Sequence, residues 1–71
     1  MEYTVNLNWD NEARVWIADS EDIPGLVLES GSFDALLERL RFAIPELLSL
    51  NNKTQPSSLR IRSERREQIA L

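Results

Sequence analysis

The alternation of apolar and polar side chains at the start of the chain most constrains its fold. Four large apolar side chains occupy every second position: Tyr3, Val5, Leu7 and Trp9. A half-buried strand needs this period of two, whereas a helix cannot gather such residues on one face. We therefore predict a strand over residues 2–9, with these four side chains toward the core.

A second strand is predicted directly after the first. The cluster of turn-forming residues at 10–12 precedes a run of β-branched and aromatic residues at 14–18, and this order is typical of an antiparallel hairpin. Within the run we expect Val15 and Ile17 to face the core. Trp16 would then lie on the opposite face of the sheet.

A polar loop and a third short strand complete the first part of the chain. The loop ends in Pro24-Gly25, a common turn signal, and the apolar run Leu26–Glu29 follows it. Residues 2–29 are thus predicted to form a three-stranded meander.

The apolar period changes to that of a helix after Gly31. Ser32 can supply an N-cap hydroxyl, and Asp34 places a carboxylate in the first turn, where it suits the helix dipole. Apolar side chains then recur at helical spacing: Phe33, Leu36, Leu37, Leu40, Ile44, Leu47 and Leu48. We predict an amphipathic helix over residues 32–50, kinked or restarted at Pro45, which has no N–H to donate.

The C-terminal part is predicted to be a loop and a strand. Residues 51–58 mix turn formers with little to bury. Four apolar residues then fall on odd positions between polar ones: Leu59, Ile61, Ile69 and Leu71. This pattern favours a basic C-terminal strand over 59–71, which would cover an edge of the sheet. A helix over 64–71 is the alternative.

The order of these elements defines an α+β fold. We expect residues 1–71 to form a single domain, a two-layer βββαβ sandwich with one helix on one face of a four-stranded sheet. Alternation assigns six residues to the other, open face: Thr4, Asn6, Asn8, Trp16, Val27 and Glu29. One covered face and one open, partly aromatic face are typical of a small binding module.

Size and composition argue against catalysis. The chain has 71 residues, no cysteine and no histidine. A domain of this size buries only about 60% of the surface of its unfolded chain, which leaves little room for a deep active site. Histidine is the ordinary general base near neutral pH and the commonest metal ligand. We therefore expect no enzyme, no catalytic residue, no metal and no cofactor.

The first residues carry no secretion signal, and no apolar stretch reaches the roughly 18 residues that span a bilayer. We expect a cytoplasmic protein without a membrane partner.

Charge divides the chain into an acidic body and a basic C-terminal segment. Residues 1–52 contain ten acidic and three basic side chains, whereas residues 53–71 contain five basic and two acidic ones. An acidic body repels phosphate backbones and attracts a basic partner.

Four short motifs follow one another over residues 3–50: Val15-Trp16-Ile17-Ala18, Ile23-Pro24-Gly25-Leu26, Glu29-Ser30-Gly31-Ser32 and Pro45-Glu46-Leu47-Leu48. In this order they resemble the HicB-like antitoxins, in particular short variants of that family. The resemblance implies a partial ribonuclease-H-like fold, in which a right-handed crossover through the helix places the last strand parallel to the first. It also implies a role, the binding and silencing of HicA, a small basic toxin that cleaves RNA.

The chain departs from the family at two places. Full-length HicB proteins commonly add a helix-turn-helix or ribbon-helix-helix domain, and residues 51–71 are too few to supply one, so we do not expect operator binding of that kind. The Gly-Cys pair common in the family is Gly25-Leu26 here, at a position that we interpret as structural.

These observations lead to two functional hypotheses. The first is an antitoxin-like module that covers a basic HicA-type toxin, with six candidate contact residues: Trp16, Asp19, Glu21, Asp22, Val27 and Glu29. The second is a small dimeric regulator that binds nucleic acid through its C-terminal segment. Three arginines are candidates for nucleic-acid or dimer contacts: Arg60, Arg62 and Arg66. An exposed sheet edge favours a homodimer in either case.

Overall fold

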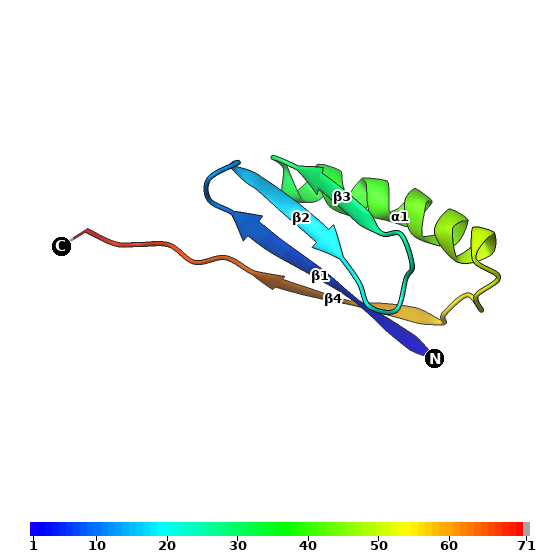
Figure 1. The fold of residues 1–71 in the computed structure, drawn as a ribbon. Coiled ribbons are helices and arrows are strands. Elements are labelled where there is room, and N and C mark those ends of the chain that lie inside the picture. The colour runs from blue at the N-terminus through cyan, green and yellow to red at the C-terminus, as the bar shows by residue number, and fades with distance from the viewer. Residues whose placement is uncertain (71) are drawn as a thin grey trace.

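The computed structural model describes residues 1–70 and has the predicted α+β architecture, with one helix packed on one face of a four-stranded sheet (Figure 1). The elements are β1 (Glu2–Asp10), β2 (Val15–Asp19), β3 (Val27–Ser30), α1 (Phe33–Leu50) and β4 (Ser58–Glu64). Within the described residues, no helix is long and apolar enough to cross a membrane.

The sheet has the order β3-β2-β1-β4. Strands β1, β2 and β3 form the predicted antiparallel meander, and β4 pairs in parallel with β1. The parallel pair brings the chain back across the sheet after α1, as the family resemblance implied. The first and last strands therefore lie side by side, although they are separated by most of the sequence.

The prediction of which face β2 turns to the core is wrong. In the hairpin Leu7 lies opposite Ala18, and Trp9 lies opposite Trp16. Opposite residues point to the same face of a sheet, so Trp16 and Ala18 share the helix-covered face with Leu7. Val15 and Ile17 consequently lie on the open face.

The helix begins and ends where the sequence predicts. The Ser32 hydroxyl accepts a hydrogen bond from the Ala35 N–H at 3.2 Å. At the other end Asn52 has a positive φ of 53°, which asparagine tolerates better than most residues. The N–H groups of Asn52 and Lys53 donate to the carbonyls of Ser49 and Leu48 at 3.2 and 2.9 Å. These two bonds form a Schellman motif that ends the helix.

Pro45 does not interrupt α1, which is assigned as a single helix over all 18 residues. Of the two outcomes predicted at Pro45, a kink or a restarted last turn, the restart does not occur. Pro45 and Arg41, whose carbonyl lacks the usual donor, both lie on the exposed side of the helix. The buried neighbours Leu40, Ile44 and Leu48 hold the helix on the sheet through this region.

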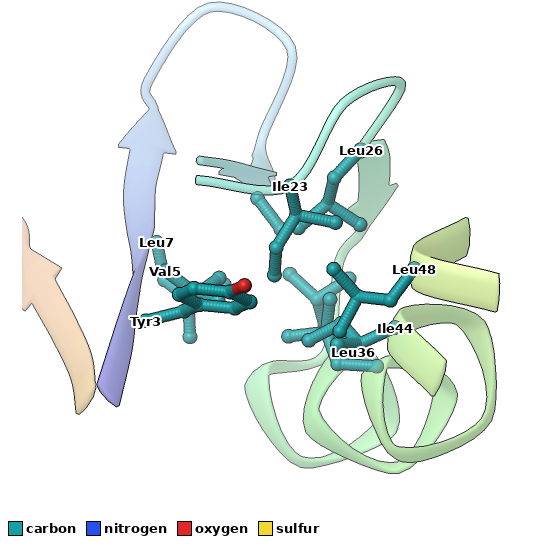
Figure 2. Close-up of a cluster of buried hydrophobic side chains, with 10 residues drawn as sticks. Tyr3, Val5, Leu7, Ile23, Leu26, Leu36, Ile44 and Leu48 are labelled. Carbon is teal, nitrogen blue, oxygen red and sulfur yellow. The ribbon is translucent and has the colours of Figure 1, made fainter. Parts of the chain in front are cut away.

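The core lies between α1 and the covered face of the sheet (Figure 2). Its buried side chains come from β1, β2, the loop before β3 and the helix: Tyr3, Val5, Leu7, Ala18, Ile23, Leu26, Leu36, Leu40, Ile44 and Leu48. Of these, Ala18 is the smallest, and its size leaves room for the larger side chains of the helix. The odd-numbered residues predicted for the core side of β1 are confirmed up to Leu7, and Trp9 is half-buried.

The helix does not cover the sheet evenly. It lies against β2 and β3 (Figure 1) and makes no close backbone contact with β4. All seven residues of β4 are exposed. The predicted last strand is too long, because β4 ends at Glu64 and residues 65–70 continue without strand pairing. The alternative helix over 64–71 is not formed in the described residues. Leu71 lies outside them.

Candidate protein-binding surface

One face of the sheet is not covered by the helix of the described chain. Register assigns its side chains: Thr4, Asn6 and Asn8 from β1, Val15, Ile17 and Asp19 from β2, Val27 and Glu29 from β3, and Arg60, Arg62 and Glu64 from β4. The face divides into two halves of different chemistry.

The half formed by β2 and β3 is apolar and acidic. Val15 and Ile17 are half-buried, and Val27 has 74% of its surface exposed. Ile17 lies opposite Glu29, and Val27 lies opposite Asp19. Each apolar side chain thus stands beside a carboxylate, and this mixture is suited to a partner that presents both apolar and basic groups.

The half formed by β1 and β4 is polar and carries arginines. Asn6 lies opposite Arg62, and Thr4 lies opposite Arg60. Arg60 forms an ion pair with Glu2, with its Nε 3.4 Å from Oε1. Because acidic side chains lie beside the arginines of β4, the described residues of this half do not form a uniformly basic surface.

The acidic loop after β2 meets the open face but is not uniform. Asp19 and Glu21 are exposed, whereas Asp22 is half-buried. The Thr4 N–H donates to Asp22 Oδ2 at 2.8 Å, and the Ser20 hydroxyl donates to the Thr4 carbonyl at 2.5 Å. These side chains replace the backbone partners that β1 lacks beyond the end of β2, so Asp22 has a structural role.

A shallow hollow brings the acidic loop next to β4. It is lined by Thr4, Asn6, Glu21, Asp22 and Arg62. Two of the predicted acidic residues, Glu21 and Asp22, and one predicted arginine are thus neighbours on one surface. Arg66 lies apart from them, beyond β4, in an ion pair with Glu64 (Nε to Oε1 3.5 Å).

Trp16 does not lie on this surface, so the prediction that places it on the open face is wrong. Its ring packs edge-to-face against Trp9 and Phe33, with centroids 5.4 and 4.9 Å apart. It also contacts the core cluster from its border. A tryptophan gains more from this burial than valine or isoleucine would, because its apolar area is larger and the edge-to-face geometry is favourable.

Sequence reasoning missed Ile17 and Val15 as residues of the open face and missed the role of Arg65. The Arg65 guanidinium lies 4.0 Å from the centroid of the Trp9 ring and joins the C-terminal segment to the covered side of the sheet. The indole Nε1 of Trp9 is buried and has no hydrogen-bond partner in the structure. The cross-strand Trp9–Trp16 pair was the signal that could have corrected the face of β2.

Within residues 1–70, no three acidic, histidine or cysteine side chains come together as a metal-binding group. The hollows on the open face are shallow and lined mainly by polar side chains. What this surface offers a partner is therefore shape, apolar contact and charge.

Fold and surface together define a small α+β domain with one uncovered sheet face. A family model described as "Domain of unknown function (DUF1902)" matches residues 2–71, and the chain belongs to this family. Among solved structures, it is similar to the hypothetical protein TTHA1013 from the extremely thermophilic bacterium Thermus thermophilus, with 34% identity over 100% of both chains and a TM-score of 0.77. No curated protein matches the chain.

Proposed function

We propose that this protein is an antitoxin-like binding module of the HicB type, which neutralises a small basic RNA-cleaving HicA-type toxin by covering its surface. The proposal rests mainly on the β2–β3 half of the open face. There Val15, Ile17 and Val27 are left without a covering layer, next to Asp19 and Glu29. The short motifs that resemble HicB-like antitoxins support the same role.

Charge supports the choice of a basic partner. The chain has a formal net charge of −4, and Asp19, Glu21 and Glu29 are exposed at or beside the open face. Complementary charge accelerates the encounter of two proteins, whereas apolar contacts at the centre of an interface slow their dissociation. Neutralisation by occlusion requires no chemical step from this chain.

Co-expression with HicA-type toxins tests the proposal. The wild-type chain should restore growth and form a complex that survives size-exclusion chromatography. Val27→Arg should abolish both effects, because it places a cation in the apolar half of the surface, where it would face a basic partner. Since Val27 is exposed, the variant should fold normally, which circular dichroism would verify.

Phe42→Arg is the matched control. Phe42 has 72% of its surface exposed, close to the 74% of Val27, but lies on the helix. This variant should neutralise the toxin as well as the wild-type chain does. An equal loss of neutralisation in both variants would contradict the proposal. The same holds if the wild-type chain neither restores growth nor forms a complex with any HicA-type toxin.

The alternative is nucleic-acid binding through the C-terminal arginines. Arg60 and Arg62 do lie on one face of β4, but Arg60 and Arg66 are in ion pairs with Glu2 and Glu64. This pairing favours the protein partner. A salt titration separates the two functions, because phosphate contacts are strongest at low ionic strength. Binding to duplex DNA or RNA at about 50 mM salt that is lost in Arg60→Gln and Arg62→Gln would favour the alternative.

A further inference from the structure

The outer edge of β4 has no partner within the described chain. The sheet order ends at β4, and all seven of its residues are exposed. On the helix-covered side, Leu59 and Ile61 have 37% and 40% of their surfaces exposed. The opposite edge strand, β3, has only four residues and lies against α1. Long uncovered edges with apolar side chains are sites where another strand adds.

Two pairs of residues around this edge are placed symmetrically about Arg65. Ile61 and Ile69 lie four residues to either side of it, and Glu64 and Arg66, which carry opposite charges, flank it directly. Ile69 has 77% of its surface exposed. Residues 65–70 have no strand partner and project away from the body (Figure 1). At these two pairs of positions the segment is complementary to a second copy of itself in the antiparallel direction.

We propose that two copies of this chain pair antiparallel along residues 60–70, around a two-fold axis at Arg65. Ile61 then lies opposite Ile69 of the partner subunit, and Glu64 lies opposite Arg66 of the partner subunit. A two-fold axis perpendicular to the sheet keeps the helix-covered faces of both copies on the same side. The dimer joins the two sheets into one and pairs the C-terminal segment of each copy with β4 of the other.

Other registers fit less well. A register centred on Ile61 places Arg60 opposite Arg62 at two symmetry-related positions, and directly opposed like charges destabilise a strand pair. The register at Arg65 opposes like charges once, where the two Arg65 side chains meet on the axis, and each of these forms an ion pair with Glu67 of its own copy. Registers centred on Arg62, Ser63 or Glu64 place Ile61 opposite a serine, an arginine or a glutamate, respectively. The register at Arg65 combines the apolar pair with the pair of opposite charges, and it also gives residues 66–70 a partner.

Contacts of Arg65 hold the C-terminal segment in an orientation that favours this pairing. The guanidinium stacks 4.0 Å from the centroid of the Trp9 ring, and its Nε lies 2.5 Å from Glu67 Oε1. These contacts fix the direction in which the chain leaves β4. A segment held in its bound conformation loses less conformational entropy on association. This inference does not depend on the proposed antitoxin role.

A charge-exchange experiment tests both the dimer and its register. In Glu64→Arg, each two-fold-related contact sets two arginines against each other, and in Arg66→Glu it sets two glutamates against each other. Each variant alone should dimerise on the order of tenfold more weakly than the wild-type chain. An equimolar mixture should recover the wild-type affinity, because the contacts of its mixed dimer join opposite charges. Sedimentation velocity at about 50 mM salt, where screening is weak, measures the three dissociation constants.

In the proposed register the mixed dimer has two such contacts between positions 64 and 66. Each joins an arginine of the Glu64→Arg copy to a glutamate of the Arg66→Glu copy. Two exposed charge reversals away from β4, Glu12→Arg and Arg41→Glu, serve as controls, and neither should weaken the dimer. Ile69→Glu should weaken it without affecting the fold, since residue 69 lies beyond the last strand. A wild-type chain that remains monomeric up to about 1 mM would overturn the proposal. The same holds if the two variants dimerise as the wild-type chain does, or if their mixture fails to recover.

Discussion

The two faces of β1 differ completely although they belong to the same nine residues. Toward the helix, Tyr3, Val5 and Leu7 are buried, whereas the intervening Thr4, Asn6 and Asn8 lie on the open face and are not. On β1 the open face is therefore polar, as expected for a face exposed to water. The strand separates apolar from polar side chains as its alternation predicts.

The neighbouring strand β2 does not follow this rule. Its covered face carries Trp16 and Ala18, and its open face carries Val15 and Ile17. Apolar side chains on a face without a covering layer contribute less to stability than the same groups in the core. The open face is therefore apolar in its β2–β3 half and polar on β1. This difference is why we propose that a partner binds at the β2–β3 half.

The largest effect should come from truncating the covered side. Leu36 is fully buried in the core, so Leu36→Ala should lower the free energy of unfolding by about 3 kcal/mol through lost apolar contact and a residual cavity. Val27→Ala, on the open face, should change it by less than about 0.5 kcal/mol. Urea unfolding followed by circular dichroism measures both values. Similar losses in the two variants would mean that the open face is covered in solution.

The next effect tests the orientation of β2 directly. Trp16→Ala should cost about 2 kcal/mol, because it removes edge-to-face contacts with Trp9 and Phe33 together with half-buried apolar area. Its neighbour Ile17 is also half-buried, but Ile17→Ala should cost only about 1 kcal/mol, since no layer packs over it. If Ile17→Ala were the more destabilising change, β2 would have the opposite orientation.

The order of the elements could be predicted because it depends on local patterns. The period of two in β1 and the helical spacing from Phe33 to Leu48 each identify their element without reference to the rest of the chain. The helix ends were equally local, since Ser32 caps one of them and Asn52 adopts a left-handed conformation at the other.

The face of β2 could not be predicted in this way. Val15, Trp16, Ile17 and Ala18 are all apolar, so the strand alternates between two apolar sets and either set could face the core. The pairing of Trp9 with Trp16 decides between them, and that contact depends on the geometry of the hairpin. In the same way β4 ends at Glu64, opposite Asn8, although an apolar residue returns at an odd position at Ile69.

The structure shows that two acidic residues of the loop, which the sequence analysis grouped together, differ in burial and hydrogen bonding. Asp22→Ala should cost about 1.5 kcal/mol, because it leaves the Thr4 N–H of a partly buried strand without its acceptor. Glu21→Ala should have little effect on stability, since Glu21 is exposed. Hydrogen exchange of the Thr4 amide gives a residue-level measurement, and it should accelerate in the first variant alone. Unchanged exchange in Asp22→Ala would contradict the structural role of this carboxylate.

The smallest effect should arise where the C-terminal segment contacts the covered side. Arg65 stacks on Trp9, and its guanidinium also lies 6.0 Å from the centroid of the Trp16 ring. Arg65→Gln should therefore lower the free energy of unfolding by only about 0.5–1 kcal/mol, the range of a partly exposed cation–π contact. It should also shift the tryptophan fluorescence, because water replaces the guanidinium over the indole. Arg66→Gln is the matched control, since Arg66 is highly exposed and pairs only with Glu64 in the described chain. Equal fluorescence changes in the two variants would show that Arg65 does not hold the segment on Trp9, and the covered face would then end at the two tryptophans rather than extend into the C-terminal segment.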